Sequence, residues 1–280
     1  MVKLPTIDEL SQAGVQLGHK ITKSSPQMRP YIEGAKNNIH QINLAETVKK
    51  LGEALDFIVQ SVSQGATILF LGTKPAAKEV IKKYAQKINV PYVAEHWIAG
   101  TLTNFATIFK LIEKLKKMAA EKQAGEWSKY TKKEELLLDR ELNRLEEMVG
   151  GIKTLIRRPD VIYVVDIGEE KTAIQESRRS RIPVVAIVDT SSDPRLVDYP
   201  IPANDDGINS IELITSLVAK AVEEGREKIP PKADQPRAEK DKGKITAAPE
   251  PKEEPKIEEK EIEIPGELVE EIKKEIGEEE

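Results

Sequence analysis

Short runs of branched apolar residues, each followed by a helical pattern, constrain the fold of this 280-residue chain more than any other feature. The clearest runs are residues 66–72 (ATILFLG), 161–166 (VIYVVD) and 184–189 (VVAIVD). Strands that are apolar on both faces are buried on both faces, and the helices between them supply the long connections that parallel strands require. The pattern predicts an α/β fold, a three-layer sandwich with a parallel sheet between two layers of helices.

Weaker patterns complete this sheet and its helical layers. Residues 91–95 and 198–201 have the composition of two further strands. Amphipathic helical spacing covers the segments between the strands and the segment before the first one. The predicted helices are residues 45–63, 75–87, 169–180 and 207–223.

One segment, residues 103–155, interrupts the alternation of strands and helices. Apolar residues recur there at three- and four-residue spacing in two stretches, and a polar turn near Gly125 separates them. This spacing predicts an inserted antiparallel helical hairpin, a coiled coil with arms of ~30 Å at 1.5 Å per residue. Its charged outer faces fit either a solvated coiled coil or an arm that binds a partner.

The charge is distributed unevenly along the chain. Residues 229–280 hold 10 of the 43 basic residues and 17 of the 48 acidic ones, so this tail has a net charge of −7 and the remainder +2. The tail is rich in Pro, Lys and Glu and poor in large apolar residues, which predicts disorder. We therefore predict a sandwich domain of residues 1–102 and 156–228, the hairpin of residues 103–155, and a mostly disordered acidic tail of residues 229–280.

The residue types that are absent exclude several classes of function. The chain has no cysteine, which excludes disulfides, thiolate metal sites and cysteine nucleophiles and favours a cytoplasmic location. No run approaches the ~18 apolar residues that a membrane-spanning helix needs, so we expect no membrane association.

Two patterns could support an enzyme. The turn of Gly72, Thr73 and Lys74 follows the first strand, where a helix N-terminus could hold a phosphate, but it matches neither GxGxxG nor GxxxxGK[ST]. A set of acids at strand ends could bind magnesium, although Asp is also the ordinary residue of strand ends and helix caps. These acids are Asp166, Asp189, Asp193, Asp205 and Asp206.

The histidines add no catalytic group, since His19, His40 and His96 lie in different segments without ligand spacing or a nucleophile partner. We therefore predict a protein without catalytic residues, cofactor or metal. A nucleotide- or sugar-phosphate-binding α/β enzyme that uses the Gly72–Lys74 turn is the alternative. A coiled-coil adaptor is a third possibility, and it merges with any function that depends on binding proteins.

A different pattern, in which basic and amide side chains occur with few acids, indicates RNA binding. The stretch from residue 18 to 37 is basic and contains prolines, so it could lay its cations along phosphates, although an ordinary solvated loop can have this composition. With only 4% aromatic residues, docking on folded RNA is favoured over base stacking. The candidate RNA-binding residues are His19, Lys20, Lys23, Arg29, Lys36, Asn37, Thr101, Thr103, Asn104, Arg157, Arg158, Arg178 and Arg179.

Six segments resemble the hallmark segments of the bacterial ribosomal protein S2 family, in that family's order and spacing. They are residues 13–19 (AGVQLGH), 26–32 (PQMRPYI), 97–104 (WIAGTLTN), 159–166 (PDVIYVVD), 182–190 (IPVVAIVDT) and 202–206 (PANDD). Three positions depart from the family pattern: Ser24-Ser25 replaces an aromatic-Asn pair, Ala99-Gly100 replaces Gly-Gly, and His96 replaces an Arg.

The resemblance implies a flavodoxin-like sheet with strand order 2-1-3-4-5 and a helical hairpin inserted after the second strand. It implies a structural constituent of the small ribosomal subunit that binds 16S rRNA between head and body and supports translation. It also implies other small-subunit proteins as partners, among them ribosomal protein S1, with no homo-oligomer.

Overall fold

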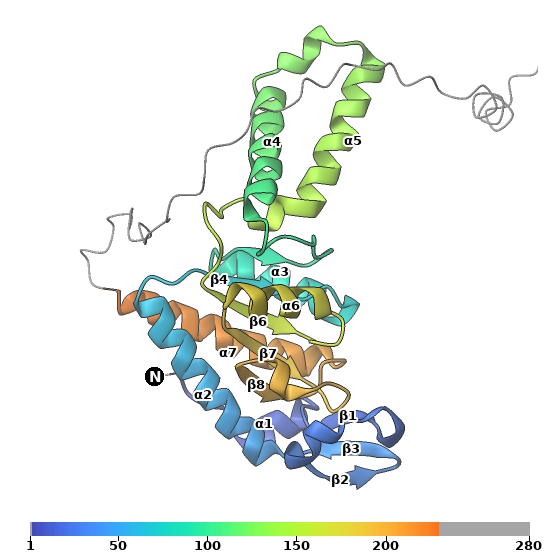
Figure 1. Cartoon of the computed structure of the whole chain (residues 1–280), viewed down its shortest axis with the longest axis vertical. Helices are drawn as coiled ribbons and strands as arrows, with labels where there is room; N and C mark the ends of the chain where they lie inside the picture. The colour runs from blue at the N-terminus through green and yellow to red at the C-terminus, as the bar shows by residue number, and fades with distance from the viewer. Residues whose placement is uncertain (1, 230–280) are drawn as a thin grey trace, which may run out of the picture. The chain divides into compact units, whose positions relative to one another are not determined.

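The computed structural model describes residues 2–229, so the predictions for residues 230–280 lie outside the described part of the chain. A five-stranded parallel sheet forms its centre, in the order β5-β4-β6-β7-β8 (Figure 1). Counted along the chain this is 2-1-3-4-5, which confirms the expected order. The strands are β4 (Ile68–Leu71), β5 (Tyr92–Val93), β6 (Val161–Val165), β7 (Val184–Val188) and β8 (Tyr199–Pro202).

Helices cover both faces of this sheet, as the apolar runs predicted. One face packs against α2 (Leu44–Ser63), α3 (Pro75–Lys87) and α7 (Ile208–Glu227), and the other packs against α6 (Lys171–Ser180). Side chains of β6 alternate between the two cores, with Tyr163 in the first and its neighbours in the second. All five residues of β6 are therefore buried, which explains its continuous apolar run.

A second, smaller sheet lies in the N-terminal region, where the sequence indicated only a loop. It is antiparallel with the order β1-β3-β2, and it follows α1 (Ile7–Gln12). Its strands are β1 (Leu17–Lys20), β2 (Ile32–Lys36) and β3 (Ile39–Ile42). The sequence pattern missed this sheet because its strands have only four or five residues. In addition, β2 is largely exposed and β1 and β3 are partly buried, so none has a continuous buried apolar face.

Two helices, α4 (Phe105–Gln123) and α5 (Lys132–Val149), occupy the segment predicted to be helical and lie side by side (Figure 1). Apolar side chains of the two helices belong to one core cluster, and Lys122 of α4 forms an ion pair with Asp139 of α5 at 2.7 Å. Coiled-coil supercoiling of this pair stays a prediction. Within residues 2–229, no helix is both long and apolar enough to cross a membrane.

Candidate functional site

Polar residues from four parallel strands meet at the carboxyl edge of the sheet. Lys74 follows β4, Asp166 follows β6, Asp189 follows β7, and both Asp205 and Asp206 follow β8. The Nζ atom of Lys74 lies 3.2 Å from Oδ2 of Asp166. It lies 2.8 Å from Oδ1 of Asp205 and 2.5 Å from Oδ1 of Asp206. Four of the five candidate acids thus gather here because parallel strands end at one edge.

The fifth candidate acid, Asp193, lies apart from this cluster. Its carboxylate accepts hydrogen bonds from Nε of Arg195 at 3.1 Å and from one terminal nitrogen of Arg195 at 2.9 Å. It also caps a short 3-10 helix (Pro194–Leu196) by accepting from the backbone N–H of Arg195. Asp193 therefore has the capping role that is ordinary for an aspartate after a strand.

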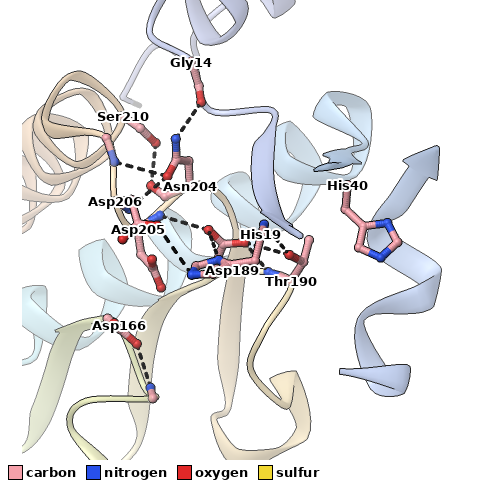
Figure 2. A network of polar contacts seen from close by, with 12 residues as sticks. Gly14, His19, His40, Asp166, Asp189, Thr190, Asn204, Asp205, Asp206 and Ser210 are labelled. Atoms are coloured by element: carbon pink, nitrogen blue, oxygen red, sulfur yellow. Dashed lines mark hydrogen bonds and ion pairs between the residues drawn. The ribbon is translucent and has the colours of Figure 1, made fainter. Parts of the chain in front are cut away.

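His19 of the small N-terminal sheet completes the cluster at the carboxyl edge (Figure 2). Its Nδ1 lies 3.2 Å from Oδ2 of Asp189 and its Nε2 lies 3.4 Å from Oδ2 of Asp206. The side chain of His19 thus points toward the acids of the sandwich and is only partly exposed. A direct RNA contact of His19 stays a prediction.

Backbone contacts around Thr190 fasten the N-terminal segment to the same edge of the sheet. The N–H of His19 donates to Oγ1 of Thr190 at 2.8 Å, and the N–H of Ser25 donates to the Thr190 carbonyl at 2.7 Å. Farther along, Nδ2 of Asn204 donates to the carbonyl of Gly14 at 3.1 Å. The cluster therefore positions the segment that carries the predicted RNA-binding cations.

The electrostatics of the cluster are dominated by acids. Burial, together with the charges of Asp166 and Asp189, raises the pKa of Asp205 to about 7. Burial by itself would lower the pKa of Lys74, but hydrogen bonds to Asp205 and Asp206 outweigh burial and raise it. The hydrogen-bonding interaction with Asp189 raises the pKa of His19. The surrounding carboxylates thus favour the protonated form of each of these two basic groups.

This charge pattern argues against a phosphate site at the Gly72–Lys74 turn. The N–H and the hydroxyl of Thr73 both donate to Oε1 of Glu170, at 2.9 and 2.6 Å. The ammonium of Lys74 is occupied by three carboxylates. A nucleotide phosphate would have to displace these acids and then face them at short range, which is electrostatically unfavourable.

The same cluster has the donor set of a cation site. His19, Asp189, Asp205 and Asp206 offer an imidazole nitrogen and carboxylate oxygens that lie within 4.8 Å of one another. Nitrogen and oxygen ligands of this kind suit a divalent transition metal such as Zn²⁺. Within residues 2–229 these four side chains are the one group of three or more His, Asp or Glu residues placed closely enough to hold a metal ion.

Replacing Lys74 by methionine is expected to destabilise the protein by about 2–4 kcal/mol at pH 8 and by clearly less at pH 5. Without the ammonium, the acids repel one another, and protonation relieves this repulsion. A carboxyl whose folded-state pKa is raised binds its proton more tightly in the folded protein, so stability falls as pH rises through that pKa. Urea denaturation at both pH values measures the effect.

Lys83 provides the matched control for this prediction. Its ammonium is exposed and pairs with Glu212 on the surface, at 2.6 Å. Lys83→Met is expected to leave the free energy of unfolding nearly unchanged at either pH, because an exposed ion pair contributes little. An equal loss at pH 5 and pH 8 in the Lys74 variant would contradict the electrostatic account.

A second polar centre organises residues 97–104 through the buried carboxylate of Glu176 in α6. Its Oε1 accepts from Nε1 of Trp97 at 3.2 Å and from the N–H of Gly100 at 2.7 Å. Its Oε2 accepts from the N–H of Leu102 at 3.0 Å and from the N–H and hydroxyl of Thr103 at 3.2 and 3.3 Å. Burial alone would raise the pKa of Glu176, but these hydrogen bonds outweigh burial and lower it.

Glu176 is not among the residues predicted from the sequence, although one signal could have identified it. Ala173 and Ser177, on the same helical stripe, are buried, so Glu176 lies on the face of α6 that packs against the protein. A carboxylate on a buried stripe requires hydrogen-bond donors from another segment. The sequence alone does not identify that segment.

The structure divides the predicted RNA-binding residues between the two edges of the sheet. The exposed residues Lys20, Lys23, Arg29, Lys36 and Asn37 belong to the N-terminal segment, which is attached at the carboxyl edge through Thr190. The exposed arginines Arg157 and Arg158 precede β6, and Arg178 and Arg179 end α6 before β7, so these four lie at the amino edge. The candidates therefore form two surfaces.

Individual side chains differ in how available they are to a partner. Thr101 is buried and its hydroxyl donates to the carbonyl of Ile98 at 2.6 Å, which leaves little surface for RNA. Thr103 and Asn104 are exposed beside it. Arg157 is held by both oxygens of Asp160, at 2.7 and 2.9 Å. In contrast, Lys20, Lys23, Arg29 and Lys36 form no ion pair with any residue between 2 and 229.

Comparisons with known proteins find a family and relatives that match most of this chain. Residues 10–225 match the family model described as "Ribosomal protein S2". The small ribosomal subunit protein uS2 of Bifidobacterium animalis subsp. lactis is 47% identical over 221 residues, which are 79% of this chain and 73% of that protein. The protein of the same name from Wolinella succinogenes is 43% identical over 221 residues, 79% of this chain and 82% of that protein.

Proposed function

This chain belongs to the ribosomal protein S2 family, and we propose that it is a structural constituent of the small ribosomal subunit that binds rRNA. As a member of this family it is a component of the ribosome and not an enzyme. In finer detail, we propose that it binds 16S rRNA and neighbouring ribosomal proteins between head and body, with ribosomal protein S1 among its neighbours. The resemblance of the six segments supports these details, together with a cytoplasmic location on the ribosome.

One observation carries the proposal, namely that the N-terminal segment presents unpaired cations on an ordered backbone. Lys20, Lys23 and Arg29 are exposed and without an ion pair within the described residues, whereas the nearby Lys74 is neutralised by acids. Hydrogen bonds to Thr190 hold the segment in place. Cations that are already positioned lose less conformational entropy when they meet phosphates, so this segment is suited to binding the RNA backbone.

The remaining parts of the chain have complementary roles in this proposal. The sandwich of residues 1–102 and 156–228 supports both cationic surfaces, including the arginines at the amino edge of the sheet. The coiled-coil hairpin of residues 103–155 binds neighbouring proteins. The acidic tail of residues 229–280 carries a charge that disfavours phosphates, so we assign it no rRNA contact.

Replacing Lys20, Lys23 and Arg29 together by alanine is expected to weaken binding to the small subunit by about 10- to 100-fold. Removal of the three cations is expected to make the plot of log affinity against log salt concentration less steep, by roughly three in slope. The free energy of unfolding is expected to stay the same, because none of the three forms an ion pair within the described residues. Mass spectrometry of purified subunits, with wild-type and variant proteins in competition, measures incorporation.

The matched control removes three exposed lysines from helices α2, α3 and α7, outside the N-terminal segment. Lys49 of α2, Lys87 of α3 and Lys220 of α7 are exposed, and the triple alanine variant has the same change in net charge. We expect this control to be incorporated like the wild type. Equal incorporation of both triple variants would remove the N-terminal segment from the RNA interface.

A further inference from the structure

The outer face of α5 carries large apolar side chains that no described part of the chain covers. Leu136 and Leu137 are 50% and 54% exposed, and Tyr130, just before the helix, is 44% exposed. The fold does not require them there, because α5 packs against α4 through other residues, including the buried Leu145. Scattered exposed leucines are ordinary, but two adjacent ones on a single helix form an apolar patch.

Basic residues share this outer face. Lys133, Leu137, Arg140 and Arg144 follow one another at helical spacing of four, three and four residues, so they form one stripe along α5. Within residues 2–229, none of these three cations forms an ion pair. The stripe therefore offers positive charge and apolar surface together.

Two acids of α5 form ion pairs with α4, whereas the exposed Glu147 follows Arg144 by three residues on the outer stripe. Asp139 pairs with Lys122 of α4 at 2.7 Å, and Glu141 pairs with Lys114 of α4. These contacts hold the two helices together and leave the outer cations without partners from either helix. A partner that fits the outer face must bring its own carboxylates.

We propose that this outer face of α5 binds an amphipathic helix with acidic flanks, contributed by a neighbouring protein of the small subunit. The face consists of Lys133, Leu136, Leu137, Arg140 and Arg144. The inference rests on the proposed function, since it requires that the chain is part of the subunit.

The chemistry of the face favours a protein helix over RNA. Leucine side chains gain by leaving water, and the backbone of an RNA duplex offers them no apolar surface. Arginines beside exposed leucines are typical of a protein interface. A guanidinium pairs with a carboxylate through two parallel hydrogen bonds, which explains the need for acids in the partner.

The spacing of the face favours a helix over a strand. Its apolar and basic residues repeat at helical intervals, and the backbone groups within α5 are already paired inside the helix. A third helix laid along the outer face of α5 would place its side chains between those of α5, as neighbouring helices do in a bundle. The face is small, so the contact gains strength from the other contacts that hold both proteins on the particle.

A photocrosslinking experiment in assembled subunits tests this proposal. The photoreactive residue p-benzoylphenylalanine replaces Leu137, the subunits are purified, and occupancy is measured before irradiation. Mass spectrometry then identifies the crosslinked peptide. We expect one protein crosslink, to a helical segment rich in Asp and Glu, and we expect Arg140→Glu with Arg144→Glu to lower its yield at least tenfold without changing occupancy.

The same photoreactive residue in place of Lys117 is the control. Lys117 is 77% exposed on α4, and we expect no crosslink to that acidic segment from its position. A crosslink from position 137 to rRNA, no crosslink, or a yield that the two Arg→Glu changes leave unaltered would overturn the inference. Absence of the unmodified chain from purified subunits would instead overturn the proposed function, which separates the two failures.

Discussion

Replacing Glu176 by alanine is expected to lower the free energy of unfolding by about 3–5 kcal/mol, the cost of removing one partner from a buried charged network. The carboxylate accepts five hydrogen bonds from residues 97–103, and the variant leaves those donors without their acceptor. Glu176→Gln is expected to lower the free energy of unfolding by about half as much. Its amide oxygen still accepts hydrogen bonds, whereas its NH2 group is a donor that would face other N–H donors. Urea denaturation measures both variants.

The pH dependence of this effect follows from the lowered pKa of Glu176. A carboxyl whose pKa is lower in the folded protein stabilises the fold above its unfolded pKa of 4.5, and this stabilisation is lost as pH falls through the folded value. The difference between wild type and Glu176→Gln is therefore expected to be full at pH 7 and to shrink below about pH 4.

Hydrogen exchange locates the change within the protein. We expect the backbone amides of Leu102 and Thr103 to exchange faster in the Glu176 variants, since both donate to its carboxylate. Gln175→Ala, on the exposed side of α6, is the control and is expected to alter neither stability nor exchange. A loss below about 1 kcal/mol in Glu176→Ala would show that water replaces the carboxylate without difficulty.

Replacing Gly151 by alanine is expected to destabilise the protein by about 2–4 kcal/mol. A Cβ at this position would lie far inside van der Waals contact with the carbonyl oxygen of Tyr92. Tyr92 begins β5, which is an edge strand of the central sheet, and Gly151 lies in the short helix (Gly150–Ile152) that follows α5. The variant must move the end of the hairpin away from the sheet, because the obstacle is backbone.

Gly34→Ala is the matched control for this steric prediction. Gly34 lies in the exposed strand β2, and a Cβ there would have no atom within 4 Å. We expect a change within about 0.5 kcal/mol in urea denaturation. Similar stability of the two alanine variants would show that the end of the hairpin adjusts freely against β5.

The regular elements of the sandwich and the hairpin could be predicted from local sequence, for a physical reason. A strand such as residues 161–165 is buried on both faces, so every residue in it is apolar, and a helix such as α4 repeats its apolar residues at 3.6-residue spacing. The small N-terminal sheet has neither signal, since β2 is mostly exposed, and it was missed. The order of the five strands came from the resemblance to a family rather than from these periodicities.

The sequence by itself determined which types of residue are available and at which edge of the central sheet the residues that follow its strands lie. That Asp166, Asp189 and Asp205 follow strands places them at one edge of any parallel sheet. Only the tertiary structure decided which charged groups meet. It places Lys74 among these acids, and it places the carboxylate of Glu176 where it accepts hydrogen bonds from residues 97–103. Such contacts join residues that are far apart in the chain, and a side chain finds its partner through the packing of whole elements, which no local periodicity encodes.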